Sequence, residues 1–134
     1  MRDPELINEL ENNRIKFSKN DLIFIARDSE GQVVWLENGN SGAGLIHLLD
    51  GDEDTPGHAD DFKRALGISR DEIPAYLFEV VAKGKVVKIR KRKANGRAGL
   101  DKIYYYQGAY HLLCGVGTNG FIVTAHPYVY KEKK

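Results

Sequence analysis

Apolar residues recur every three or four positions in several segments of the first two-thirds of the chain, and this spacing predicts helices. The predicted helices cover residues 3–13, 43–49, 58–66 and 70–81. Glycines that follow the last two segments favour helix ends at those points. The first part of the chain is therefore expected to be mainly helical.

Capping residues define two of these helices at their N-terminal ends. Asp3 is a suitable cap and Pro4 fits the first helical position. Ser69 has Glu72 three residues later, which is the pattern of a capping box. In the helix that follows the capping box, the apolar residues that are expected to share one face are Ile73, Leu77, Val80 and Val81.

Short runs of β-branched and aromatic residues, separated by turn residues, predict strands. Residues 22–25 and 32–36 flank the turn at 28–31, so they are expected to form a hairpin. The last third of the chain predicts an antiparallel meander, with a tight turn at residues 115–120 that includes Asn119-Gly120. Its expected strands are residues 85–90, 102–106, 109–113 and 121–125.

Helices that precede a run of strands indicate an α+β fold. We expect N-terminal helices packed on one face of a C-terminal four-stranded antiparallel sheet, with an N-terminal β-hairpin. The 134 residues suit one domain. Within it, residues 1–20 form a helix and lead-in, and residues 128–134 form a frayed tail.

Several classes of protein are excluded or disfavoured. Cys114 is the only cysteine, so an intramolecular disulfide and a Cys-rich zinc site are excluded. No apolar run approaches a membrane span, and the polar N-terminus predicts neither a signal peptide nor a membrane anchor. A calcium-binding loop is disfavoured, because Thr55 and Asp61 occupy the positions at which such a loop needs glycine and glutamate. Phosphate-loop and dinucleotide motifs are missing, so no metal, nucleotide or other cofactor is expected.

The formal net charge of +1 hides a strong segregation of charge along the sequence. Acidic residues predominate in residues 1–82, whereas residues 83–102 hold nine basic residues and a single acid, Asp101. A dense basic run can follow a phosphate backbone, although it can also protect a sheet edge. The expected RNA contacts are Lys85, Lys88, Arg90, Arg92 and Arg97, together with Asn119 of the turn.

Histidine is the side chain best suited to acid–base chemistry near neutral pH. His47 lies in an otherwise apolar helix and His58 begins the next one, so the two are expected to converge if the acidic loop between them folds back. Thr124 offers a hydroxyl to a phosphate oxygen from the closing strand. Tyr105 follows the basic run and is a candidate for base stacking or proton transfer, although a tyrosine-rich core explains it equally well.

Three stretches together resemble the toxin branch of the barnase–EndoU–colicin–RelE (BECR) ribonuclease superfamily. Its members include toxin domains of contact-dependent inhibition systems and phage-associated nucleases. The resembling stretches are Phe24–Asn40, Ala43–Phe62 with its two helical histidines, and Gly117–Pro127. In the family the two histidines lie closer in sequence, whereas residues 50–57 separate them here.

The resemblance implies metal-independent cleavage of RNA, often tRNA, by attack of the 2′-hydroxyl, which leaves a 2′,3′-cyclic phosphate. It places His47 and His58 as acid–base partners and Thr124 on the phosphate. Lys102 or Arg97 is our own choice for the cation that stabilises the phosphate. The implied setting is the bacterial cytoplasm of a target cell, reached as part of a larger toxin, with a cognate immunity protein as partner.

Two other functions remain open. A non-catalytic RNA-binding module with the same sheet would bind RNA in a salt-sensitive manner without cutting it. A protein-interaction domain, such as a phage accessory protein, would have no affinity for RNA. His47 within an apolar helix favours the nuclease.

Overall fold

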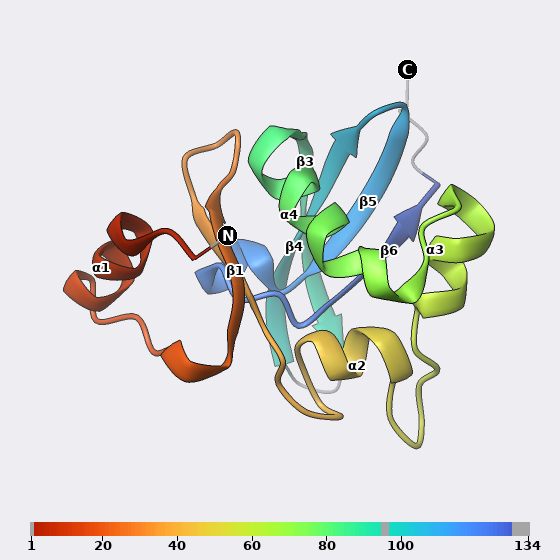
Figure 1. Cartoon of the computed structure of the whole chain (residues 1–134), viewed down its shortest axis with the longest axis horizontal. Helices are drawn as coiled ribbons and strands as arrows, with labels where there is room; N and C mark the ends of the chain where they lie inside the picture. Colours follow the sequence, from red (N-terminus) through yellow and green to blue (C-terminus); the bar gives the residue numbers. More distant parts are fainter. Residues whose placement is uncertain (1, 95–96, 130–134) are drawn as a thin grey trace.

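The computed structural model describes residues 2–94 and 97–129, and it has an α+β architecture (Figure 1). The helices are α1 (Pro4–Asn12), α2 (Leu45–Asp50), α3 (Ala59–Leu66), α4 (Ile73–Lys83) and α5 (Val116–Asn119), with short 3-10 segments η1 (Lys19–Asp21) and η2 (Arg70–Glu72). The strands are β1 (Leu22–Arg27), β2 (Val33–Glu37), β3 (Lys85–Ala94), β4 (Arg97–Tyr106), β5 (Ala109–Cys114) and β6 (Thr124–Tyr128).

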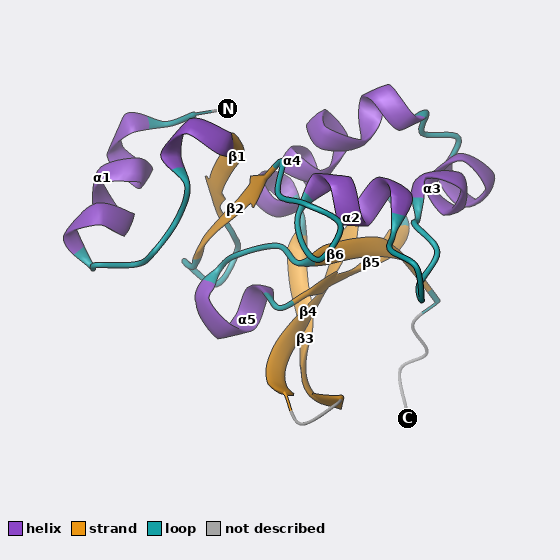
Figure 2. Cartoon of the chain, turned by 90° about the horizontal axis from the view of Figure 1, so that it is seen from below, coloured by secondary structure: helices purple, strands orange, loops and turns teal. Residues whose placement is uncertain are grey.

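The strands form two antiparallel sheets. β1 and β2 make a hairpin, and β3-β4-β5-β6 form a four-stranded meander in sequence order. Helices α2, α3 and α4 lie along one side of the larger sheet (Figure 2). This arrangement confirms the predicted α+β class, the hairpin and the four-stranded sheet. No helix in the described ranges is long and apolar enough to cross a membrane.

The capping box before α4 is present as predicted. Glu72 Oε1 accepts hydrogen bonds from the Ser69 backbone N–H at 3.1 Å and from the Ser69 hydroxyl at 2.6 Å. The first turn of this segment is the 3-10 segment η2, and the α-helix then runs from Ile73 to Lys83. The predicted apolar face is fully buried in the main core. Local sequence signals and tertiary packing therefore agree at this helix.

The predicted closing strand, residues 121–125, is wrong in its bounds. The strand that pairs with β5 begins at Thr124 and ends at Tyr128, so Tyr128 belongs to the sheet rather than to a tail. Residues 121–123 instead run beside β2: the Trp35 backbone N–H donates to Gly120 at 2.9 Å, and Ile122 donates to Trp35 at 3.0 Å. The apolar run at residues 121–125 therefore pairs first with β2 of the hairpin and then, from Thr124, with β5 of the larger sheet.

The predicted tight turn at residues 115–120 contains the short helix α5. Gly120 after it has a φ of 99°, and a Cβ there would lie 2.2 Å from the carbonyl oxygen of Val33. Only glycine allows this close approach of the two backbones. The Asn-Gly pair therefore ends a helical turn rather than forming a hairpin.

The two faces of the larger sheet have different surroundings, because side chains alternate along each strand. The helix face carries Tyr104, Tyr106, His111, Leu113 and Ala125, which are all buried. The opposite face, which we call the open face, carries the residues between them: Asp101, Ile103 and Leu112 on it are buried, whereas Tyr105 is exposed. Strand register aligns Tyr105 with Tyr110 and Tyr110 with Tyr128 on that face. Leu112 and His126 are likewise aligned.

Candidate functional site

Two imidazoles meet at the edge of the larger sheet. His58 immediately precedes α3, and His126 is in the middle of β6. Their ring centroids are 4.7 Å apart, and the planes are inclined by 34°. His126 is far from His58 in the sequence, so the structure gives His58 a partner that sequence spacing did not reveal.

The His58 ring is oriented by a carboxylate. Its Nδ1 donates to Asp61 Oδ2 at 2.8 Å, one helical turn along α3. A hydrogen bond from His58 is the main reason why the pKa of Asp61 is lowered, and Arg64 adds to the effect from 2.7 Å. Because the carboxylate only accepts, Nδ1 carries a proton and Nε2 is left for other partners.

The His126 ring is held in the same tautomer. Its Nδ1 lies 2.8 Å from the carbonyl oxygen of Pro127, which only accepts hydrogen bonds. Nδ1 is therefore the donor, and Nε2 is again left for other partners. Burial lowers the pKa of His126, and the charge of His58 lowers it further. The neutral form is consequently favoured near pH 7, as a general base requires.

Thr124 lies two residues before His126, on the same face of β6. Its hydroxyl oxygen is buried and has no hydrogen-bond partner among the described residues. A buried polar atom without a partner is costly in a folded protein, so this hydroxyl calls for an explanation. The fold encloses it, and the predicted contact of Thr124 with a phosphate oxygen stays a prediction.

Arg90 is an exposed cation on the β6 side of this region, whereas Arg64 pairs with Asp61 on the α3 side. Its guanidinium donates to the Tyr128 hydroxyl at 2.6 Å and lies 5.6 Å from the centroid of the Tyr128 ring. That ring is 6.2 Å from the ring of His126. Arg90 starts from β3, so its long side chain spans the open face toward β6.

The structure places Lys102 in a different environment from the one predicted. Its side chain is on the helix face, and the residue is only 3% exposed. Its Nζ donates to Asp28 Oδ2 at 2.8 Å and lies 2.9 Å from Glu30 Oε1. Asp28 also accepts a hydrogen bond from the Tyr104 hydroxyl at 2.8 Å. These contacts connect the β1–β2 hairpin to the larger sheet. They also pair the Lys102 ammonium group, which was expected to bind phosphate, with two carboxylates.

His47 also differs from the prediction. Its Nδ1 lies 2.6 Å from the carbonyl oxygen of Ser41, in the loop before α2. The backbone N–H of His58 donates to Leu48 at 2.7 Å, so the loop does fold back between α2 and α3. Within the described residues, however, no hydrogen bond or ring contact joins His47 to His58.

The remaining predicted contacts are spread over the surface. Tyr105 is 41% exposed, and Lys85, Lys88 and Arg90 are exposed on the open face. Asn119 accepts a hydrogen bond from the backbone of Phe121 at 3.0 Å and so shapes its own turn. Arg92 and Arg97 are in β3 and β4, and their side chains lie outside the described part of the structure.

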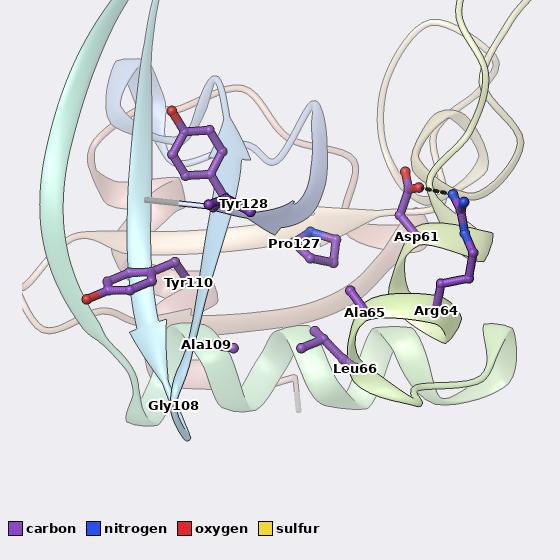
Figure 3. Close-up of a pocket in the computed structure, with 10 residues that line it drawn as sticks. Asp61, Arg64, Ala65, Leu66, Gly108, Ala109, Tyr110, Pro127 and Tyr128 are labelled. Atoms are coloured by element: carbon purple, nitrogen blue, oxygen red, sulfur yellow. Dashed lines mark hydrogen bonds and ion pairs between the residues drawn. The ribbon is translucent and has the colours of Figure 1, made fainter. Parts of the chain in front are cut away.

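A cavity of about 510 Å³ lies between α3 and the ends of β5 and β6, lined by Asp61 and Pro127 but by neither histidine (Figure 3). Ala65 and Leu66 line it on one side and Ala109 and Pro127 on the other. The Asp61–Arg64 ion pair lies at one end, whereas the ring of Tyr110 is directed away from α3. No cluster of three or more metal-ligating side chains occurs in the described ranges.

Comparison of the chain with models of known protein families gave no match, and comparison with curated proteins gave none either.

Proposed function

We propose that this protein is a metal-independent endoribonuclease whose acid–base partners are His58 and His126. The observation that carries the proposal is the close approach of two imidazoles, each with Nδ1 bonded to an acceptor. Both Nε2 atoms are thereby left to exchange protons with a substrate. RNA supplies its own nucleophile, the 2′-hydroxyl, so proton transfer and charge stabilisation are the contributions that the protein must make.

In the proposed reaction, neutral His126 removes the proton from the 2′-hydroxyl through Nε2. The 2′-oxygen attacks the adjacent phosphorus, and the bond to the leaving 5′-oxygen breaks. Protonated His58, oriented by Asp61, donates a proton to that leaving oxygen. The products are a 2′,3′-cyclic phosphate and a 5′-hydroxyl, so one proton is taken up and one is released.

The extra negative charge on the phosphate needs positive partners. The Arg90 guanidinium contacts the Tyr128 ring beside His126, and Thr124 lies two residues before His126, so both are proposed as hydrogen-bond donors to the phosphate. Arg90 would need to leave Tyr128, or share its donors with it, when RNA binds. A guanidinium suits this role, because it presents several donors to phosphate oxygens at once.

The resemblance to BECR toxins agrees with the order of elements, helices followed by a four-stranded antiparallel sheet. On that resemblance we propose tRNA as the substrate and the cytoplasm of a bacterial target cell as the place of action. A cognate immunity protein is the implied partner. An acidic surface on that protein would complement Lys85, Lys88 and Arg90 and speed association.

The test is incubation of the protein with total tRNA in the presence of EDTA. Discrete fragments are expected, because no step requires a metal ion. Cleavage that EDTA abolishes would contradict the proposal. Salt-sensitive binding without any cleavage would instead support a non-catalytic RNA-binding module, a function that the exposed Tyr105 and neighbouring lysines also favour.

A further inference from the structure

We infer that a row of tyrosines on the open face binds unpaired bases, so that the substrate is a single-stranded segment or loop of RNA rather than a duplex. This inference rests on the proposed function and adds the substrate class to it. The tyrosine row consists of Tyr105 on β4, Tyr110 on β5 and Tyr128 on β6.

The tyrosine row follows from the strand register. Tyr105 is directly opposite Tyr110, and Tyr110 is directly opposite Tyr128. The rings of Tyr105 and Tyr110 are 5.1 Å apart and inclined by 57°. Neighbouring strands are about 4.8 Å apart, so the row crosses about 10 Å of the sheet. That width suits the two or three bases that stack on aromatic residues of other RNA-binding sheets.

The main core does not require Tyr105 and Tyr110 for its packing. Tyr104 and Tyr106 project to the opposite side, where they are buried among the core residues beneath the helices. Tyr105, between them in sequence, is 41% exposed. An exposed aromatic ring on a sheet face, next to another ring, is the arrangement that base stacking uses.

Cations border the tyrosine row on β3. Lys85 is directly opposite Tyr105, Lys88 is opposite Ile103, and Arg90 is opposite Asp101. The register therefore puts these three exposed basic residues on the open face. Arg90 also contacts the Tyr128 ring and hydroxyl. Bases on the tyrosine row would thus have their phosphates beside positive charge, as single-strand binding requires.

The tyrosine row also leads to the proposed catalytic pair. The rings of Tyr128 and His126 are 6.2 Å apart, and those of His126 and His58 are 4.7 Å apart. A nucleotide that stacks at this end of the row would place a neighbouring phosphate near the imidazoles. Because a duplex hides its base faces within its own stack, only unpaired nucleotides can use such a surface.

The test measures binding of a fluorescein-labelled, eight-nucleotide 2′-O-methyl RNA by anisotropy, since this probe lacks the nucleophile and stays intact. A second probe has the same backbone with the central bases removed, and a third is a duplex of the same sequence. We expect the wild-type protein to bind the single strand more tightly than either of the others. The comparison between probes needs no variant protein.

Variants identify the residues responsible. Tyr105→Leu should weaken binding of the single strand by about 5- to 150-fold, the range for loss of one stacked base, and leave binding of the abasic probe unchanged. Tyr105→Phe keeps the ring and should bind like wild type. Ile89→Ala is the matched control, because Ile89 is a similarly exposed residue on the opposite face of β3.

Equal affinity for the single-stranded and abasic probes would overturn the inference, as would tighter binding of the duplex. An equal loss of affinity for both probes in Tyr105→Leu would overturn it too. In each case cleavage of tRNA in EDTA would still support the proposed ribonuclease. Stacking without cleavage would contradict the ribonuclease and leave the single-strand-binding site in place.

Discussion

His58 and His126 lie far apart in the sequence, yet their imidazole rings are 4.7 Å apart at the edge of the sheet. The contact joins the start of α3 to the middle of β6. Each ring donates through Nδ1, His58 to Asp61 and His126 to the Pro127 carbonyl. Proton exchange through the remaining Nε2 atoms is the chemistry to which this geometry is best suited.

The first prediction concerns which histidines are required. His58→Ala and His126→Ala should each slow RNA cleavage by about 10²- to 10⁴-fold, the usual contribution of a general acid or base. His47→Ala is the matched control, since it removes an imidazole that contacts Ser41 instead. Single-turnover rates on one tRNA measure all three. A greater loss in His47→Ala than in His126→Ala would reassign the partner of His58 to His47.

The second prediction concerns Asp61 as a positioning residue. Asp61→Ala removes the carboxylate that accepts a hydrogen bond from His58 Nδ1 and orients the ring. We therefore expect a lower kcat with little change in KM, and partial recovery of kcat in Asp61→Asn, whose amide oxygen can still accept. Asp60→Ala is the control, because Asp60 is an exposed neighbour in the first turn of α3. An equal loss of kcat in Asp60→Ala, or a rise in KM with kcat unchanged in Asp61→Ala, would contradict a positioning role.

The third prediction separates stability from catalysis at the two basic residues. Lys102→Met leaves the buried Asp28 carboxylate without its ion pair, and breaking a buried pair costs about 3–5 kcal/mol in the free energy of unfolding. At temperatures where the variant is folded, it should cleave RNA as wild type does.

Arg90→Met should show the converse, near-normal stability and slow cleavage. Urea unfolding and cleavage rates, measured on both variants, give the comparison. Slow cleavage by folded Lys102→Met would restore Lys102 as the phosphate-binding cation.

The fourth prediction is a loss of stability in mild acid. His111 is fully buried, with Nδ1 near the Tyr104 carbonyl at 3.2 Å and Nε2 at 2.6 Å from the Tyr76 hydroxyl. Burial lowers the pKa of His111, and it also lowers that of His126. As the pH falls below the ordinary value of about 6.5, the unfolded chain takes up protons first. The free energy of unfolding should therefore be greatest above pH 6.5 and decrease below it.

Urea unfolding at pH 7.5 and pH 5.5 measures this effect. His111→Gln removes one titrating group, so its free energy of unfolding should depend less on pH, although the variant is less stable at both values. A pH dependence as steep as that of wild type would show that His111 takes no part in it.

Elements with strong local signals were predicted well. The capping box at Ser69 and Glu72 fixed the start of the η2–α4 segment, and the turn at residues 28–31 fixed the first hairpin. Alternation of side chains along a strand puts Tyr105 on the face opposite Tyr104 and Tyr106, and the burial of those two residues and the exposure of Tyr105 agree with it. These features depend on hydrogen bonds and packing between residues close in sequence.

The features that sequence reasoning missed depend on tertiary contacts. The run at residues 121–123 has the composition of a sheet strand, but the open edge of β2 binds its backbone before β6 begins. Lys102 lies in a basic run that indicates exposure, yet Asp28 and Glu30 from the hairpin surround its ammonium group. His126 was overlooked because its partner is distant in sequence. Its position two residues after Thr124, on the same strand face, was the available signal.

The end-group chemistry of cleaved tRNA tests the proposed mechanism most directly. Wild-type protein in EDTA should produce fragments that end in a 2′,3′-cyclic phosphate and begin with a 5′-hydroxyl, and His126→Ala, folded as wild type, should produce almost none. Fragments with 3′-hydroxyl and 5′-phosphate ends, or cyclic-phosphate fragments formed equally fast by His126→Ala, would contradict catalysis by the His58–His126 pair.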